Sequence, residues 1–216
     1  AVTAILFAVY NAVQVNQAAA VVLRQALAAC VCAIGTAIAV LALMPLIELV
    51  SGLTSDITLL ELSDTRHPLL QRLALEAPGT YHHSLMLAGL AEAAARAIGA
   101  HPLWVRVGAY FHDVGKLVKP EFFVENTALR SSPHDALSPG MSRLVIMSHV
   151  KEGLRLARQY HLPRPVLDAI EQHHGTALMS FFYQRAVSEG GGAPIQQGEY
   201  RYSGPRPRTR EQALLS

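Results

Sequence analysis

The sequence predicts an all-α protein, with a membrane-spanning start followed by a helical domain. Three observations predict this class. An uncharged, mostly apolar run covers residues 26–47, and all ten histidines lie after residue 50. Beyond that point apolar residues recur at steps of three and four, without the alternation that is typical of strands. Of the 216 residues 51% are hydrophobic, and the excess lies at the front, which separates a membrane part from the part that carries the polar chemistry.

Residues 1–50 are predicted to be the end of a multi-span membrane region. Arg24 is the first charged residue and Glu48 the next. At about 1.5 Å per residue, the run 26–47 is long enough to cross a hydrocarbon core of about 30 Å. The alternative for this run is a buried helix of a soluble core, and a signal peptide is excluded because there is no basic start or cleavage site. Residues 1–13 are interpreted as the close of an earlier span, so the chain is expected to begin inside a larger membrane region.

Composition excludes two classes of partner or scaffold. The net charge of +2 comes without a basic stripe, which argues against large nucleic acid as a partner. The two cysteines, Cys30 and Cys32, both lie in the apolar run. They offer neither a disulfide framework nor the spacing of a zinc ribbon.

The helices of the second part are predicted from their start and stop signals. Residues 51–66 are predicted to be a connector, and residues 67–216 a helical domain. Thr80 is expected to cap a long helix that Gly99 stops, and the pair Ser138 and Pro139 to start another. The expected helices cover residues 68–76, 81–98, 102–112 and 139–160, a segment that ends at 173–175, and a segment through 181–182.

The remaining stretches are predicted to be loops. Residues 115–139 are rich in turn formers and are interpreted as an active-site loop with a short helix near Glu121. Gly190 to Gly192 opens a polar loop. Thr209 and Gln212 have the spacing of a capping box, which marks one more helix start. Because the sequence stops four residues later, it is expected to be truncated at this end as well.

Histidines and an aspartate at helix ends form the strongest chemical signal. The run YFHDVGK (residues 110–116) places His112 beside Asp113, and His173 and His174 are followed by Gly175. A lone helical histidine is usually an ordinary polar residue, but several buried imidazoles without a metal would leave polar groups unpaired. The expected metal ligands are His83, His112, Asp113, His149, His173 and His174. Such imidazole-rich ligation favours iron, manganese, nickel or zinc over magnesium.

These residues stand in a series of recognisable motifs. The motifs are LLELSD (59–64), HPLL (67–70), EAPGTYHHS (76–84), GAYFHDVGK (108–116), EFFVEN (121–126), HVKEG (149–153) and QHHGT (172–176). The chain resembles the HD-domain superfamily of metal-dependent phosphohydrolases and, within it, the seven-transmembrane HD family of bacterial cyclic-di-AMP phosphodiesterases. The resemblance covers nearly the whole chain, including Pro45 and Glu48. It implies a multi-pass protein of the bacterial plasma membrane whose cytoplasmic HD helical bundle hydrolyses cyclic di-AMP to pApA.

The resemblance also implies roles for individual residues. His83, His112 and Asp113 would hold one metal, and Asp113 would bridge to a second. The second metal would be held by His149, His173 and His174. The family uses a further aspartate that would lie just beyond Ser216. The expected cofactors are two divalent transition-metal ions, manganese or iron, about 3.5 to 4 Å apart, which activate a hydroxide for the hydrolysis.

Lys116 and His134 are the expected substrate contacts. Lys116 is predicted to pair with a phosphate oxygen and to act in catalysis with Asp113; the alternative is a solvated loop lysine. Phe181 and Phe182 are interpreted as core residues rather than as a platform for a base. Two other functions stay open: hydrolysis of another nucleotide by an HD enzyme, and a catalytically inactive sensor of metal or nucleotide. The Gly-Tyr-Pro motif of cyclic-di-GMP enzymes is absent, and the oligomeric state is not predicted.

Overall fold

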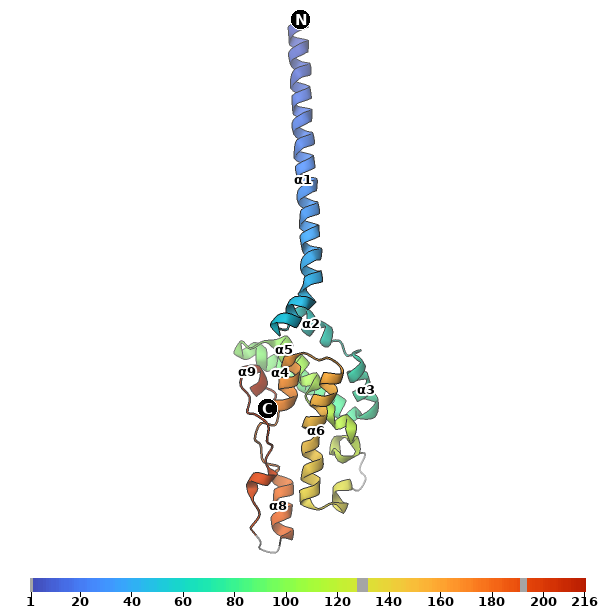
Figure 1. Ribbon diagram of the computed structural model, residues 1–216, viewed down its shortest axis with the longest axis vertical. Helices are drawn as coiled ribbons and strands as arrows, with labels where there is room; N and C mark the ends of the chain where they lie inside the picture. Colours follow the sequence, from blue (N-terminus) through green and yellow to red (C-terminus); the bar gives the residue numbers. More distant parts are fainter. Residues whose placement is uncertain (1, 128–131, 191–193) are drawn as a thin grey trace. The chain divides into compact units, whose positions relative to one another are not determined.

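A continuous helix, α1 (Val2–Ser51), forms the first part of the chain (Figure 1). Its segment Ile5–Glu48 is long and apolar enough to cross a membrane. At about 1.5 Å per residue, the 50 residues of α1 extend about 75 Å, more than twice a hydrocarbon core of about 30 Å. Residues 2–13, part of the stretch interpreted as the close of an earlier span, lie in the same continuous helix as residues 26–47. No proline or glycine lies between residues 14 and 25, so nothing in the backbone ends the helix there.

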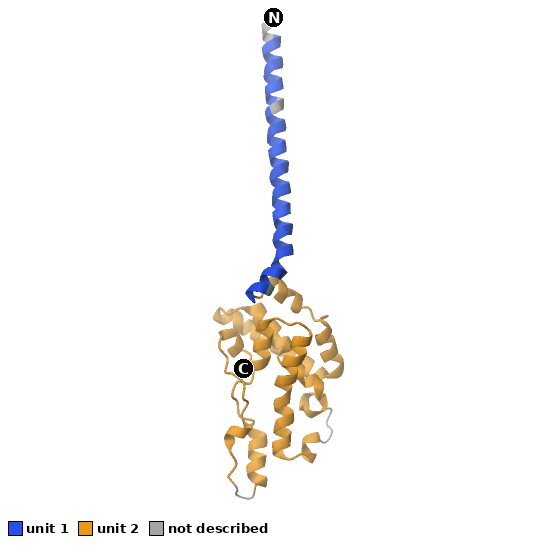
Figure 2. Ribbon diagram, viewed as in Figure 1, with its two compact units in different colours: residues 1–53 blue, residues 54–216 orange. Residues whose placement is uncertain are grey.

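The computed structural model describes residues 2–127, 132–190 and 194–216, and these fall into two compact units (Figure 2). The first unit is Ala1–Leu53 and the second Thr54–Ser216. Within the described ranges the second unit contains helices and one isolated antiparallel bridge, between Leu178 and Arg201, but no strand. The predicted all-α class is confirmed.

The predicted connector is partly helical. Helix α2 (Asp56–Leu62) begins at Ser55, whose hydroxyl accepts a hydrogen bond from the Thr58 amide. Leu59 and Leu62 are buried and belong to the larger core cluster. The capping serine and the step of three between the two leucines are the signals that identify this helix in the sequence.

The predicted longer helices of the second unit are present. They are α3 (Pro68–Glu76), α4 (Pro78–Ile98), α5 (Pro102–Phe111), α6 (Pro139–Gln159), α7 (Arg164–Gln172) and α8 (Ser180–Glu189), followed by the short α9 (Arg210–Ala213). Several begin with a proline, whose fixed φ and missing N–H suit the first helical turn. The α4 helix packs on α3 and α5, and α6 packs on α7 and α8. The capping box of Thr209 and Gln212 is confirmed at the start of α9.

The predicted cap of α4 is wrong. This helix begins at Pro78, so Thr80 lies inside its first turn, and Ala77 at the N-cap position provides no side-chain hydrogen bond. Instead, the Thr80 amide donates to the side chain of Asn126, 46 residues further along the chain, at 3.0 Å. A distant side chain thus takes the place of the local cap.

Short 3-10 helices fill most of the predicted loop 115–139. They are η1 (Val114–Val118), η2 (Pro120–Phe122), η3 (Val124–Asn126) and η4 (Pro133–Ala136), and a further one, η5 (Gln197–Tyr200), follows later in the chain. Residues 128–131 of this predicted loop, and residues 191–193, which include most of the predicted polar loop at Gly190, lie outside the described residues. The described part of the 115–139 segment is therefore held in defined turns close to α4 and α6.

Candidate metal centre

The core fixes the His112–Asp113 pair from both sides. His112 follows the last residue of α5, and Asp113 precedes η1. Phe111 before the pair and Val114 after it are completely buried in the larger core cluster. His112 and Asp113 are each only 3% exposed. The two core residues that flank the pair, Phe111 and Val114, thus fix the backbone on both sides of His112 and Asp113.

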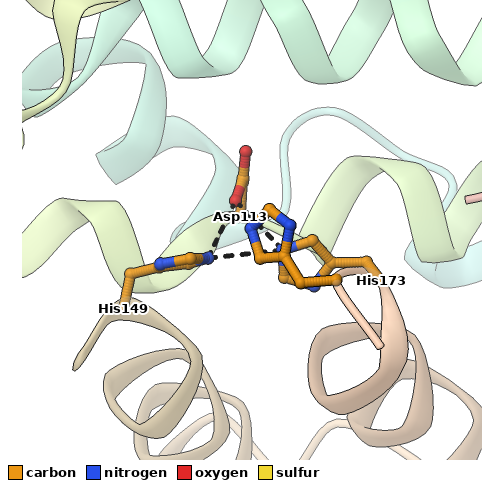
Figure 3. Close-up of side chains that lie close together, drawn as sticks. Asp113, His149 and His173 are labelled. Carbon is orange, nitrogen blue, oxygen red and sulfur yellow. Dashed lines mark hydrogen bonds and ion pairs between the residues drawn. The ribbon is translucent and has the colours of Figure 1, made fainter. Parts of the chain in front are cut away.

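Two further helices bring histidines to the same place. His149 lies in the middle of α6, and His173 directly follows α7. Gly175, with φ of +49°, lets the chain turn after His174. Ligand atoms of Asp113, His149, His173 and His174 all lie within 4.8 Å of one another. Figure 3 shows the first three of these side chains converging from three different segments.

Asp113 also belongs to a second group. Ligand atoms of His83, in α4, and of His112 and Asp113 likewise lie within 4.8 Å of one another. The two carboxylate oxygens of Asp113 face different groups: Oδ2 lies 3.2 Å from His112 Nε2, and Oδ1 lies 3.4 Å from His149 Nε2. All six side chains predicted as ligands therefore lie in two groups that share Asp113; we call them the His/Asp cluster.

Backbone carbonyls hold three of the histidine rings in one orientation. The Nδ1 atoms of His112, His149 and His173 lie 2.8, 2.5 and 2.8 Å from the carbonyl oxygens of the residues three positions earlier. A carbonyl can only accept, so each Nδ1 carries a proton and donates it. In a neutral ring the Nε2 lone pair is then directed into the cluster, as a metal ligand requires.

Three electron-rich atoms meet at the centre of the cluster without a hydrogen-bond donor between them: His149 Nε2, His173 Nε2 and Asp113 Oδ1. His149 Nε2 and His173 Nε2 lie 3.3 Å apart, and in the neutral rings neither carries a proton. Asp113 Oδ1 is buried without a hydrogen-bond partner, 3.5 Å from His173 Nε2. Electron-rich atoms that converge in this way repel one another unless a cation lies between them. The described residues therefore fit a divalent metal ion.

The electrostatics of the cluster favour a cation as well. Burial alone would raise the pKa of Asp113, but His112, His173 and Lys116 together lower it well below its ordinary value. Burial lowers the pKa of His149 to about 4. Burial, with His173 and His149 nearby, lowers the pKa of His174 to about 2. At neutral pH the cluster therefore presents the Asp113 carboxylate and the unprotonated imidazoles of His149 and His174.

The metal-free protein is expected to lose stability as the pH falls below about 6.5. Unfolded histidine takes up a proton near its ordinary pKa of 6.5, whereas folded His149 does so only near 4. Between these values the unfolded state binds more protons, so acid favours unfolding. Urea unfolding in a chelator at pH 8, 6 and 5 measures the effect, which His149→Gln should reduce. His82→Gln, at an exposed position of α4, is the control, and a flat stability profile over this range would contradict the prediction.

The predicted substrate contacts lie in different surroundings. Lys116 Nζ is 2.8 Å from Asp113 Oδ2 and 2.7 Å from Glu125 Oε1, so the lysine is not a solvated loop residue. His134 is outside the His/Asp cluster, and its Nε2 donates to the Phe122 carbonyl at 2.9 Å. Glu125 was not identified from the sequence. It is the second acidic residue of the EFFVEN motif, but no local pattern marks it as a partner of Lys116.

Tyr202 is a second residue of the site that was not identified from the sequence. Its ring stacks on His174, with centroids 4.1 Å apart and an interplanar angle of 17°. Burial, with the charge of Asp113 nearby, raises the pKa of Tyr202 above its ordinary value. Tyr202 therefore keeps its hydroxyl proton at neutral pH and covers one side of the cluster.

Two cavities lie near residues of the candidate site, and only the first is lined by a residue of the cluster. One, of about 320 Å³, is lined by residues that include His174, Tyr202 and Lys151. The other, of about 440 Å³, is lined by residues that include Phe122, Glu125, His134, Phe182 and Arg185. Phe181 is 69% exposed and also borders the second cavity, so it is not the core residue that was expected. Space for a ligand thus exists beside His174 of the cluster and beside Glu125, the partner of Lys116.

Comparisons with known proteins agree with this geometry. The cyclic-di-AMP phosphodiesterase PgpH of Bacillus subtilis is 46% identical over 181 residues, which cover 84% of this chain and 25% of that protein. The protein of the same name from Listeria monocytogenes is 46% identical over 173 residues, covering 80% of this chain and 24% of that protein. The chain therefore spans about a quarter of the length of these curated relatives.

A solved structure and a family model match the second unit. The crystal structure of the L. monocytogenes phosphodiesterase PgpH HD domain in complex with cyclic di-AMP is 47% identical. It has a TM-score of 0.67, and the match covers 70% of this chain and 70% of that one. The family model described as the HD domain matches residues 80–216, which contain the whole His/Asp cluster. The chain belongs to the HD-domain family.

Proposed function

We propose that this chain is the hydrolytic part of a membrane-anchored phosphodiesterase that cleaves cyclic di-AMP to pApA. The observation that carries the proposal is the pair of ligand groups joined by the single carboxylate of Asp113. Hydrolases of phosphate esters commonly use two metal ions held close together. The relatives named as cyclic-di-AMP phosphodiesterases, and the solved domain in complex with that nucleotide, support the choice of substrate.

The two groups define which residues would hold each ion. His83, His112 and Asp113 would hold the first ion, and Asp113 would bridge to the second. The second ion would be held by His149, His173 and His174. Manganese or iron is the proposed metal, because imidazole-rich ligands disfavour magnesium. When bound, such ions supply positive charge for the phosphodiester oxygens and activate water as the nucleophile near neutral pH.

The chain's own residues prepare the site for this chemistry. The carbonyls behind His112, His149 and His173 accept from each Nδ1, so that each ring turns its Nε2 toward the cluster. Lys116 places a positive charge 2.8 Å from Asp113, where it stabilises negative charge that develops on a nearby phosphate. Phe123, whose ring lies 5.7 Å from that of His149, excludes water from one side.

The shape of the site suits a ligand with two bases. The cavity of about 320 Å³ is lined by His174, and the cavity of about 440 Å³ is lined by Glu125. In the larger cavity the exposed ring of Phe181 provides an apolar face for a base, and His134 lines the same space. We propose that a base of the substrate occupies this cavity, with His134 as a substrate contact.

The remaining proposals concern the membrane. The Ile5–Glu48 segment of α1 is long and apolar enough to span a bilayer, and none of its most apolar stretch is buried in the protein. We propose that the full protein is a multi-pass component of the bacterial plasma membrane with the HD domain on the cytoplasmic side.

Turnover by the manganese-loaded or iron-loaded protein tests the proposed activity. Cyclic di-AMP, cyclic di-GMP and simple nucleotides are supplied in parallel, and the products are identified by chromatography. Release of pApA from cyclic di-AMP, with at least about tenfold preference over the other substrates, is the expected result. If the protein hydrolysed only another nucleotide, it would be an HD hydrolase with a different substrate. Stable metal binding without any turnover would favour a sensor.

A further inference from the structure

Lys116 lies between two carboxylates, and only one of them belongs to the His/Asp cluster. Its Nζ is 2.8 Å from Asp113 Oδ2 and 2.7 Å from Glu125 Oε1, and its side chain is 14% exposed. Two of the three ammonium protons are thus directed at carboxylates. The lysine is held on one side by a predicted metal ligand and on the other by Glu125, which is not part of either ligand group.

Glu125 is in turn fixed by the first turn of α4. The Thr80 hydroxyl donates to Glu125 Oε1 at 3.1 Å, and Asn126 Nδ2 donates to the Thr80 hydroxyl at 2.9 Å. These hydrogen bonds form a chain with one direction. The Asn126 amide donates to the Thr80 hydroxyl, which donates to the Glu125 carboxylate, and Lys116 donates to both Glu125 and Asp113. The carboxylate of Glu125 therefore has its position set before any ligand arrives.

The backbone is shaped for the same contact. A Cβ added to Gly79 would lie 1.8 Å from the Glu125 carbonyl oxygen, so only a glycine lets η3 come this close to α4. His83 follows one turn later on α4. The packing that holds Glu125 beside Lys116 thus also joins the segment to the helix that carries a predicted ligand.

Charge decides what Glu125 does when the cluster is loaded. In the metal-free protein, Asp113 and Glu125 share the Lys116 ammonium. Divalent ions on the Asp113 oxygens would repel that ammonium and weaken its hold on Asp113. Glu125 is then the carboxylate that keeps Lys116 in place, next to the bound phosphodiester.

We propose that Glu125 is a positioning residue, which keeps the Lys116 ammonium beside the loaded cluster, and that Thr80 and Asn126 hold the Glu125 carboxylate for this purpose. The proposal rests on the proposed phosphodiesterase function for its kinetic consequence. Its consequence for metal binding does not depend on any turnover. Glu125 acts through Lys116, so its effects should disappear when Lys116 is absent.

A double-mutant cycle on the whole chain tests the coupling. Glu125→Gln and Lys116→Gln are each expected to lower kcat between about tenfold and about a hundredfold, with KM changed less than about threefold. The double variant should be no slower than Lys116→Gln alone, because residues that act as a unit are not additive. Thr80→Val, which keeps the shape and removes the donor to Glu125, should show a smaller loss of the same kind. Glu121→Gln, at an exposed position of the same segment, is the matched control.

Manganese titration of the same variants separates this proposal from the proposed function. With Glu125→Gln the Lys116 ammonium pairs with Asp113 alone and binds that carboxylate more strongly. The manganese ion must compete with this ammonium for Asp113, so manganese affinity should fall about tenfold. Lys116→Gln should bind manganese at least as tightly as the unmodified chain, and the double variant should match it. An inactive unmodified chain would overturn the phosphodiesterase proposal but not this one. Additive effects of the two substitutions on metal affinity would overturn the positioning role.

Discussion

Replacing Asp113 by asparagine is expected to abolish hydrolysis of cyclic di-AMP, with a loss of about a thousandfold or more. One oxygen of Asp113 faces His112 and the other faces His149 and His173. The amide keeps the shape of the side chain but removes the negative charge that both predicted metal sites share. Manganese content by elemental analysis should fall together with kcat.

Asp64→Asn is the control for this substitution. Asp64 lies in the same unit and forms an exposed ion pair with Arg66, and such surface pairs contribute little to stability. Its metal content and turnover should match those of the unmodified chain. If Asp113→Asn kept both ions and lost less than about tenfold in rate, Asp113 would not be a bridging ligand.

Replacing Gly115 by alanine is expected to destabilise the domain by roughly 3 kcal/mol or more and to disorganise the His/Asp cluster. A Cβ at this position would lie 1.8 Å from the carbonyl oxygen of His149 and 2.5 Å from the amide nitrogen of Gly153. Both neighbours are helix backbone, which cannot move aside as a flexible side chain does. The η1 turn, which follows Asp113 directly, would have to withdraw from α6.

Urea unfolding and manganese titration of the Gly115 variant measure the two effects. Gly89→Ala is the matched control, since an added Cβ there meets no atom within 4 Å. In the middle of α4 that substitution should raise stability by about 1 kcal/mol. A Gly115→Ala protein with unchanged stability and metal affinity would show that the close approach of η1 and α6 is not needed.

The sequence predicted most helices because their ends carry local signals. Proline begins α3, α5 and α6, and Gly99, with φ of +67°, ends α4 as expected. The α2 helix was missed because the polar residues around it resemble a linker. Thr80 was misassigned because its threonine has a good local capping pattern, whereas the actual partner of its amide, Asn126, is 46 residues away. Contacts across such distances have no signature in a short stretch of sequence.

The candidate site was predictable only where its residues stand in local motifs. The paired motifs at His112 and at His173 stand out in the sequence, and the structure brings all six predicted ligands into two groups around Asp113. Their role as ligands stays a prediction. Glu125 and Tyr202 were missed because each acts on the site through a single neighbour, Lys116 or His174. The contacts of Glu125 with Lys116 and of Tyr202 with His174 depend on how the helices pack, which the sequence does not show directly.

The carbonyls that hold the three histidine rings allow the domain to fold before it binds metal. In small zinc domains the ion organises the chain, and the apo form is unfolded. Here backbone groups of α5, α6 and α7 orient His112, His149 and His173 without an ion. The chain can therefore fold first and take up its ions afterwards, as a finished cage.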